Sequence, residues 1–445
     1  MAFHQGLSGL SSSAKALDVI SHNVANSSTV GFKSSAAVFG DVYASAMVGA
    51  TSNNQVGMGS AVNSVRQSFV QGSISATNNP LDVAISGNGF FIMNRPDGSI
   101  GYTRNGQFDF DRNGNIINAT GDKLTGFPVI DSTVVPAVFG GTVQPLYVDT
   151  NHITPRETTV STIGVNFDSK ATSPLDKLPP GPDINDYLDA ASIPVDSYNA
   201  TTSYTVYDSL GNAHVTTLFF VRGEAVDGVS PNTWSVYSRM SSDVRPDPDD
   251  PSANLGRPLE LLGEVDFTQF GVLDKADPTN GIFELTRTPD ELGTGAAPLT
   301  FSLDLSKSTQ WNAAFGVTTA PWQDGYTTGR ITGVSVNSDG VVRATYSNGA
   351  SKDIGQVALA EFRAPQGLIS VGDNLWAESY DSGQPAIGAP GTGVLGLVAS
   401  NRVEESNVDL TQELVNMIVQ QRNYQANAQT IRTQDQILQT LVNLR

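Results

Sequence analysis

Small and apolar residues recur every three or four positions near both ends of the chain. Near the start they follow a 3-4-3-4-3 spacing, at Leu7, Leu10, Ala14, Leu17, Ser21 and Val24. This spacing places them along one face of a helix, and the turn-forming segment 26–31 predicts where that helix ends. Residues 409–445 contain neither Gly nor Pro, and predict one long helix. Its stripe continues the alternation at Leu410, Leu414, Met417, Gln421, Tyr424, Ala428, Ile431, Asp435, Leu438 and Val442.

The two predicted helices are either ordinary amphipathic helices packed on a globular body or the self-assembly seams of a polymer. Residues 409–445 contain eight Gln and four Asn but only six charged residues. A helix with a free outer face usually carries more charge, so uncharged amides favour a helix that packs against neighbours on several sides. We therefore expect the two ends to pair as a coiled coil and to drive self-assembly. Gln421 and Asp435 within the stripe would set the register of that pairing.

Between the ends, short apolar runs alternate with turn signals, which predicts β structure. One set of strands falls in 69–145 and a second in 331–364, with hairpin turns expected at Asp97-Gly98, Asp339-Gly340 and Asn348-Gly349. The predicted fold is α+β and multidomain: a terminal helical coiled coil plus two mainly-β domains, the second inserted into the first. The predicted segments are 1–30 with 400–445 for the helices, 31–70 for a linker or extended hairpin, 71–145 with 328–399 for the first β domain, and 146–327 for the inserted outer β domain.

Charge is distributed unevenly along the 445 residues. The formal net charge is −19, of which residues 31–404 carry −18. An acidic body argues against nucleic acid and against an anionic membrane surface as partners. The chain has no Cys and four His, which excludes disulfides and thiolate sites and leaves little for a His-based centre. The first 20 residues lack the basic and apolar regions of a cleaved secretion signal, so these rules alone predict a cytoplasmic protein.

Three motifs suggest chemistry, and each has a simpler explanation. Residues 109–116 match the first eight positions of a calcium-binding loop, but Thr120 stands where a bidentate Glu is required, so a hairpin turn is expected. Residues 391–396 match a dinucleotide fingerprint without a surrounding βαβ unit. Asp247, Asp249 and Asp250 lie in a Pro-rich segment that predicts a solvated loop. We expect no catalytic residues, no metal and no cofactor, and hence a protein that is not an enzyme.

Longer motifs carry a resemblance to a known family. Residues 23–33, 69–91 and 102–106, together with 405–410 and 421–427, are similar to the bacterial flagellar rod and hook axial proteins. The positions that carry this likeness most directly are Asn26, Gly31, Phe32, Lys33, Gln71, Gly72, Asn79, Pro80, Leu81 and Asp82. The added segment 146–327 contains 207–214 and 323–326, which resemble the hook branch of the family. A distal rod protein with an insertion is the alternative within the family. A secreted β-rich enzyme or glycan-binding protein with borrowed ends is the alternative outside it.

The resemblance implies a structural subunit of a curved helical tube that transmits motor torque as a universal joint. It implies partners in further copies of the chain, in the distal rod protein, in the hook cap protein and in the hook-filament junction protein. It also implies export through the flagellar type III apparatus to an extracellular position without a cleaved signal. That expectation replaces the cytoplasmic one. The assembly would be noncovalent, since there is no Cys for crosslinking.

Overall fold

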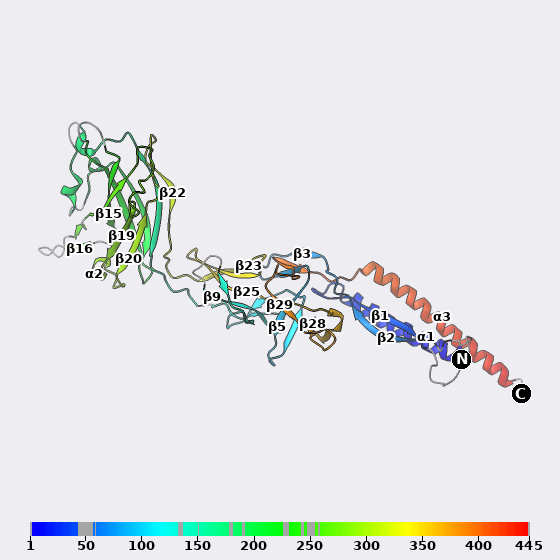
Figure 1. Ribbon diagram of the computed structural model, residues 1–445. Coiled ribbons are helices and arrows are strands. Elements are labelled where there is room, and N and C mark those ends of the chain that lie inside the picture. The colour runs from blue at the N-terminus through cyan, green and yellow to red at the C-terminus, as the bar shows by residue number, and fades with distance from the viewer. Residues whose placement is uncertain are drawn as a thin grey trace. The chain divides into compact units, whose positions relative to one another are not determined.

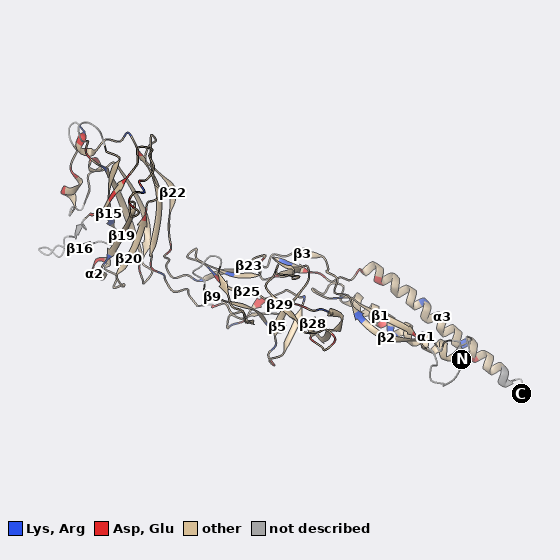
Figure 2. Cartoon of the chain, in the orientation of Figure 1, with Lys and Arg blue, Asp and Glu red and all other residues tan. Residues whose placement is uncertain are grey.

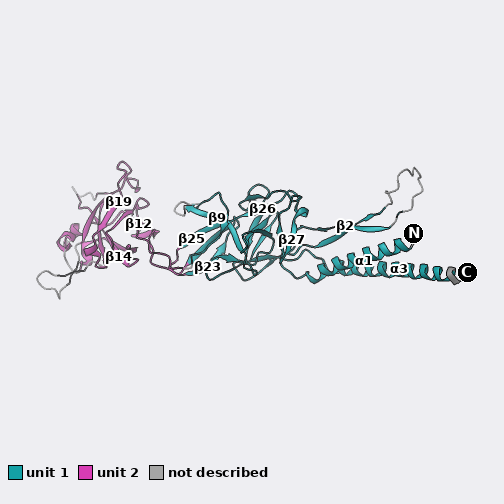
Figure 3. Cartoon of the chain, turned by 90° about the horizontal axis from the view of Figure 1, so that it is seen from below, with its two compact units in different colours: residues 1–150, 331–345, 351–445 teal, residues 151–330, 346–350 magenta. Residues whose placement is uncertain are grey.

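The computed structural model describes most of the chain in two compact units. The described residues are 2–42, 57, 59–131, 137–149, 151–177, 181–188, 192–225, 231–241, 244–246, 254–256 and 259–443. Unit 1 comprises residues 1–150, 331–345 and 351–445, and unit 2 comprises 151–330 and 346–350 (Figure 3). The fold is mostly β, with long helices only in the two terminal segments of the described chain (Figure 1).

Unit 1 contains the two long helices, α1 (Ala2–Ala25) and α3 (Leu410–Asn443), which contact each other (Figure 1). The Asp409 side chain caps α3, because its Oδ1 accepts the N–H groups of Thr411 (2.9 Å) and Gln412 (3.1 Å). The predicted capping box is only half formed, since the Gln412 amide turns away to Asn416. A two-stranded ribbon of β1 (Ser35–Asp41) and β2 (Ser60–Gln67) contacts α1.

The β part of unit 1 is built around an antiparallel sheet whose described path runs β23-β24-β25-β9-β5-β6-β28-β27. Two small pairs, β3 with β31 and β4 with β30, join segments from opposite ends of the sequence. The remaining elements of unit 1 are β3 (Ile74–Ala76), β4 (Val83–Ser86), β5 (Phe90–Asn94), β6 (Ile100–Thr103), β7 (Asp109–Phe110), β8 (Ile116–Ile117), β9 (Lys123–Asp131), β10 (Val138–Phe139), β11 (Gln144–Pro145), β23 (Ile331–Val336), β24 (Val341–Tyr346), β25 (Ser351–Val357), β26 (Leu359–Glu361), η4 (Pro365–Gly367), β27 (Ile369–Gly372), β28 (Leu375–Ala377), β29 (Ala386–Gly388), β30 (Leu397–Ser400) and β31 (Arg402–Glu404).

Unit 2 packs two sheets around one apolar core. One sheet is ordered β13-β14-β15-β18, and the other is ordered β19-β20-β12-β21 with β22 also paired to β12. Phe167, Phe220 and Trp234 lie at the centre of the core and are fully buried. The elements of unit 2 are β12 (Val160–Asp168), η1 (Pro174–Asp176), η2 (Ile184–Tyr187), η3 (Val195–Ser197), β13 (Ala200–Tyr207), β14 (Ala213–Arg222), β15 (Thr233–Met240), β16 (Val244–Pro246), β17 (Asn254–Gly256), β18 (Glu260–Asp266), β19 (Ile282–Arg287), α2 (Pro289–Leu292), β20 (Leu299–Asp304), β21 (Thr309–Trp311) and β22 (Gly316–Gln323).

A single hairpin design recurs in both units, at residues 95–99, 111–115, 118–122, 208–212, 268–272, 337–341 and 346–350. In each, the first residue donates its N–H to the carbonyl of the fifth, and the fourth residue, Gly, donates to the carbonyl of the first. The Gly has a positive φ, as at Gly114 (85°) and Gly340 (77°), which is the geometry of a type I turn closed by a bulge. The predicted turns at Asp97-Gly98, Asp339-Gly340 and Asn348-Gly349 are therefore confirmed, and so is the hairpin interpretation of residues 109–116.

The boundary between the units differs from the predicted insert. The prediction begins the insert at residue 146, but Leu146 donates its N–H to the Leu124 carbonyl and Val148 donates to the Gly114 carbonyl, both 2.8 Å and both within unit 1. Leu146 and Val148 are also buried there. Unit 2 consequently starts at residue 151. The hydrophobic pattern missed this because the strand-like character of the chain does not change between 144 and 160.

Candidate functional site: the terminal helices and a buried ion cluster

The buried face of α1 lies one residue before the predicted stripe. The buried positions are Gly6, Ser12, Ser13, Ala16, Ile20 and Asn23, and Gly9 is close-packed; all of them except Ser12 keep a 3-4-3-4-3 spacing. A Cβ added at Gly6 would lie 3.1 Å from Ile431 Cγ1, and one added at Gly9 would lie 2.8 Å from the Asn427 amide. Small residues therefore face α3, since they let the two backbones approach closely.

This displacement leaves the predicted α1 residues at the margins of the contact. Leu10, Ala14, Leu17 and Val24 are half-buried beside it, while Leu7 is exposed. The prediction chose the largest apolar side chains as the seam. In the pairing within the chain, the structure instead places Gly6 and Gly9 against α3.

Helix α3 divides the predicted positions into two groups. Met417, Ala428 and Ile431 are half-buried, whereas the side chains of Leu410, Leu414, Tyr424 and Leu438 are 39–54% exposed. Gln421 and Asp435 are exposed as well, and the side chain of Val442 lies outside the described residues. Leu410 and Leu414 continue to the exposed Ile418, and together they form a stripe with i, i+4, i+8 spacing. Few charged groups lie along these helices (Figure 2).

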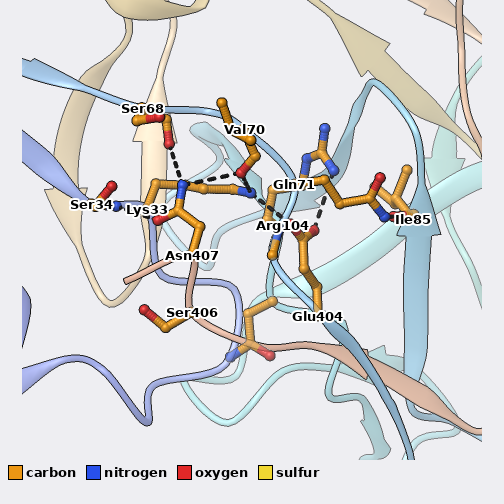
Figure 4. Close-up of polar contacts among 12 residues, drawn as sticks. Lys33, Ser34, Ser68, Val70, Gln71, Ile85, Arg104, Glu404, Ser406 and Asn407 are labelled. Carbon is orange, nitrogen blue, oxygen red and sulfur yellow. Dashed lines mark hydrogen bonds and ion pairs between the residues drawn. The ribbon is translucent and has the colours of Figure 1, made fainter. Parts of the chain in front are cut away.

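The family-like residues after α1 meet the strand before α3 in a cluster of buried charges (Figure 4). Lys33 Nζ lies 2.6 Å from Glu404 Oε1 and donates to the Val70 carbonyl at 2.8 Å. Arg104 approaches the other carboxylate oxygen at 3.2 Å, and the Gly72 N–H donates to Oε1 at 2.9 Å. Lys33 and Glu404 are fully buried and Arg104 is 4% exposed. One carboxylate thus holds three segments of unit 1 together.

Electrostatics make this cluster costly to break. Burial lowers the pKa of Lys33 and the pKa of Arg104, and the facing Glu404 carboxylate opposes both shifts. The Arg104 guanidinium also lies over the Phe90 ring, with its Cζ 5.2 Å from the centroid. Two cations would be left buried without a counter-charge if the carboxylate were removed.

Glycines allow the chain to approach the cluster closely. Gly31 has φ +70°, and a Cβ there would clash with the backbone of Arg104 and Asn105. A Cβ at Gly72 would clash with the Glu405 carbonyl. Both positions therefore require Gly, which gives two of the family-like residues a steric role.

Amide side chains bridge the same segments. Asn407 Oδ1 accepts the Ser34 N–H at 2.7 Å, and its Nδ2 donates to the Ser68 carbonyl at 2.7 Å. Gln71 donates to the Ile85 carbonyl and accepts the Gly87 N–H, which fixes the path of β4.

Asn23, 1% exposed, links the end of α1 to β1 and α3. It exchanges two hydrogen bonds with the Ser35 backbone and donates to Glu413 Oε1 at 3.3 Å. Asn23 therefore sets the position of the ribbon against both helices.

The other family-like residues form local turns. The Asn26 N–H and side chain both donate to the His22 carbonyl, and Thr29 donates to Asn26 Oδ1, which ends α1. Asn79 accepts the Leu81 N–H and donates to Asp82 Oδ1, so residues 79–82, which include Pro80, close into a turn with Leu81 and Asp82 buried. Phe32 is buried beside His22.

The two motifs of the insert also have structural roles, within unit 2. Asp324 accepts the N–H groups of Thr159 (2.8 Å) and Val160 (3.0 Å) and pairs with Arg156 at 3.0 Å, so it joins the first and last segments of the unit. A Cβ at Gly325 would clash with Thr158.

Asp208, fully buried, closes its hairpin turn. Its carboxylate accepts from Asn212 (2.9 Å) and Thr294 (2.9 Å) and lies 3.1 Å from His214 Nε2. Burial alone would raise the pKa of Asp208, but hydrogen bonds from Asn212 and His214 outweigh it and lower the pKa to about 2.

The candidate chemical sites either have a structural role or lie outside the described residues. Asp111 Oδ1 accepts the N–H groups of Asn113 and Asn115, so the calcium-like loop uses its carboxylate within the turn. Asp247, Asp249 and Asp250 lie outside the described residues. Among the described residues, no group of three or more His, Asp or Glu side chains is arranged to hold a metal ion. In the same part of the chain, no helix has the length and apolar character needed to cross a membrane.

The sequence analysis did not identify Glu404, and it included Arg104 only as part of the family-like segment 102–106. Lys33 and Glu404 are 371 positions apart, and no local pattern marks Glu404 as buried. The only sequence signal was its neighbourhood, since the family-like segment begins at residue 405.

Comparisons with known proteins agree with this architecture along the whole chain. Four family models match: "Flagella basal body rod protein" at residues 4–33, "Flagellar hook protein FlgE/F/G D1 domain" at 84–166, "Flagellar basal body protein FlaE D2 domain" at 188–326 and "Flagellar basal body rod FlgEFG protein C-terminal" at 399–444. Helical ends, a first β domain and a further β domain thus define a structural protein of the flagellar rod and hook class.

Full-length relatives specify the branch. The chain is 40% identical over 447 residues to the flagellar hook protein FlgE of Salmonella typhimurium and 39% identical over 445 residues to that of Escherichia coli, covering 100% of each chain. It is 31% identical to FlgE of Borreliella burgdorferi, covering 100% of this chain and 99% of that one. The chain belongs to the flagellar hook protein family.

A solved structure supports the fold. The crystal structure of Helicobacter pylori flagellar hook protein FlgE2 matches with a TM-score of 0.52 at 15% identity, covering 74% of this chain and 100% of that chain. At this identity the match concerns the fold alone.

Proposed function

We propose that this chain is the structural subunit of a flagellar hook and assembles with its own copies into a curved helical tube that works as a universal joint. The observation that carries this proposal is the 40% identity to a hook protein along the full length of both chains. A polymer of one protein requires a heterologous interface that does not close into a ring. The exposed stripe Leu410, Leu414 and Ile418 offers apolar area for such an interface.

In this proposal the two ends of the chain form one coiled-coil domain that lines the tube, and the β domains form the outer layers. The insert is nested in the first β domain, so that both terminal segments return to the inner wall. Continuous apolar burial between helices, at about 25 cal/mol per Å², would hold the tube together. The acidic outer domain would make wet contacts of small net energy that can slide as the tube bends.

The proposal extends to the neighbours of the hook. We infer that one end of the assembled hook binds the distal rod protein and the other end binds the hook-filament junction protein. We also infer that a hook cap protein guides growth of the tube. The subunit would leave the cell through the flagellar type III export apparatus. The near-neutral helices, which include α3 with its two arginines and two acids in residues 410–443, suit a closely packed inner wall.

Electron microscopy of polymer grown from the purified chain tests the proposal. Curved tubes are the expected product. Straight rods would indicate a rod protein instead, and the absence of any polymer over a wide range of concentration and salt would contradict self-assembly.

A further inference from the structure

Five Asn-Gly pairs occur along the chain, and each combines the two residue types that favour loss of ammonia from an amide side chain. They are Asn88-Gly89, Asn105-Gly106, Asn113-Gly114, Asn280-Gly281 and Asn348-Gly349. In this reaction the backbone nitrogen of the Gly attacks Cγ of the Asn. Gly favours the attack because it has no Cβ to hinder the approach and its backbone adopts many conformations. The folded surroundings of each Asn amide then decide which pair reacts.

Three of the five Asn side chains are half-buried and held by hydrogen bonds. Asn280 Oδ1 accepts the Asp266 N–H at 3.1 Å, and its Nδ2 donates to the carbonyls of Asp266 (2.9 Å) and Asp274 (2.8 Å). Asn348 is held by two hydrogen bonds and Asn105 by one. These amides must lose their partners before Cγ can meet the backbone nitrogen of the next residue.

The Asn88 amide is free of such restraints. Asn88 is exposed, and its side chain makes no hydrogen bond to any residue that the structure describes. It lies in the bend between β4 and β5, with Gly87 (φ +112°) before it and Gly89 (φ +120°) after it. Glycines on both sides give the backbone freedom to bring the Gly89 nitrogen to the amide.

Asn113 is the nearest competitor. It is exposed too, and its side chain likewise has no hydrogen-bond partner in the described part of the chain. The Gly114 N–H, however, donates to the Asp111 carbonyl at 3.1 Å, and the Gly114 carbonyl accepts the Val148 N–H at 2.8 Å. The attacking nitrogen at this pair is therefore held within a hairpin turn.

We propose that Asn88 is a site of spontaneous deamidation in the folded chain. The Gly89 nitrogen forms a bond to Asn88 Cγ, the Cγ–Nδ2 bond breaks, and Nδ2 leaves as ammonia with the proton lost by the Gly89 nitrogen. Water then opens the resulting succinimide ring at either carbonyl, which gives Asp or isoaspartate. Water is the only other reactant. The reaction requires only the folded chain, so it does not depend on assembly.

The product would alter a junction within unit 1. The Asn88 carbonyl accepts the Gly396 N–H at 2.8 Å, and the Gly87 N–H donates to Gln71 Oε1 at 3.1 Å. Isoaspartate lengthens the main chain by one methylene group and adds a carboxylate, so both contacts must adjust. The modification thus adds negative charge beside the pairing of β4 with β30.

Mass spectrometry of aged protein tests this assignment. The purified chain would be incubated at neutral pH and digested at intervals, and each Asn-Gly peptide would be scored for Asp and isoaspartate. Asn88 should react at least about tenfold faster than Asn280 or Asn348, since those amides must first lose two or three hydrogen bonds. Asn113 should react at an intermediate rate. In guanidinium chloride, where the hydrogen bonds are absent, the advantage of Asn88 should disappear.

Two matched variants assign the product to its residue. Asn88→Gln should abolish the product at this position, because a longer side chain would have to close a larger ring. Asn113→Gln should leave the rate at Asn88 unchanged. Equal rates at Asn88 and Asn280 in the folded chain would overturn the proposal. An advantage of Asn88 that persists in the unfolded chain would overturn it as well, because the fold would then not be its cause.

Discussion

Unit 2 and unit 1 differ in where they place charge and apolar surface. Unit 2 carries a net −13 and unit 1 a net −6 of the total −19, although unit 2 is the smaller. Unit 2 encloses one large apolar core between two sheets. Unit 1 buries a charged cluster, Lys33 with Glu404 and Arg104, and leaves an apolar stripe on α3 exposed.

The difference shows two ways of using a polypeptide in an assembly. We expect a unit with a closed core to fold independently, and a strongly acidic surface disfavours association with other acidic surfaces. In unit 1, buried ionic contacts join segments that are distant in the sequence. Apolar helix surface remains exposed there and is available to contact another copy. The following predictions test this comparison by thermal unfolding of the chain, in which we expect each of the two compact units to give its own transition.

The largest effect is expected at Glu404. Glu404→Ala leaves Lys33 and Arg104 buried without a counter-charge, so the free energy of unfolding of unit 1 should fall by about 3–5 kcal/mol. Calorimetry should show the unit 1 transition shifted and the unit 2 transition unchanged. Glu405→Ala is the matched control, because Glu405 is adjacent and exposed, and it should change stability by no more than about 0.5 kcal/mol. Equal effects of the two variants would show that the cluster does not hold unit 1 together.

Assembly should depend on the exposed stripe of α3. Leu414→Asp places a charge where apolar burial between copies is proposed. The critical concentration for assembly should rise at least thirtyfold, which corresponds to about 2 kcal/mol, and a sedimentation assay should detect little or no polymer. The monomer should unfold as before within about 1 kcal/mol, since Leu414 is 44% exposed. Gln412→Asp, on the same helix, is the control. Normal sedimentation of Leu414→Asp would remove the exposed stripe from the assembly interface.

The sequence predicts some of these features and not others. The helices, the capping Asp409 and the recurring hairpins follow from local chemistry, because a turn such as 337–341 is decided by the residues within it. The cluster of buried charges does not follow from local chemistry, because Lys33 pairs with Glu404, 371 residues away. Residue type alone gives no sign that Glu404 is buried.

The one-residue displacement of the α1 face has a physical cause as well. The side chains of Leu7 and Leu10 are more hydrophobic than Gly6 and Gly9, so a search for hydrophobic periodicity selects the leucines. Close approach of two helices instead favours the residues with the smallest side chains, and the Cβ positions at Gly6 and Gly9 are already crowded by Ile431 and Asn427. The preference becomes visible only when the partner helix is in place.

Unit 2 should lose stability in acid at one identifiable group. Asp208 has a pKa of about 2 in the folded chain, below its ordinary value of 3.8, so its contribution is complete above pH 4 and is lost as the pH falls from about 4 to 2. The contribution is about 2 kcal/mol. Asp208→Asn keeps the side-chain oxygen of the turn but cannot titrate. Its unit 2 transition should therefore fall less steeply over that range, while unit 1 behaves alike in both proteins. Parallel acid profiles for unit 2 would contradict this role.

The smallest loss of stability is expected from removing an exposed ion pair, and it should be similar in both units. The two units would then differ in their buried groups and not in their exposed ion pairs. Arg343 pairs with Asp353 across β24 and β25 in unit 1, at 2.6 and 3.1 Å, and Arg156 pairs with Asp324 at 3.0 Å in unit 2. Both arginines are nearly half exposed. Arg343→Met and Arg156→Met should each lower the stability of their own unit by no more than about 1 kcal/mol, and 1 M salt should shrink both effects because it screens exposed charges. A loss several times larger in either unit would mean that its surface charges contribute as much to the fold as the buried cluster, and the contrast between the units would then be one of net charge alone.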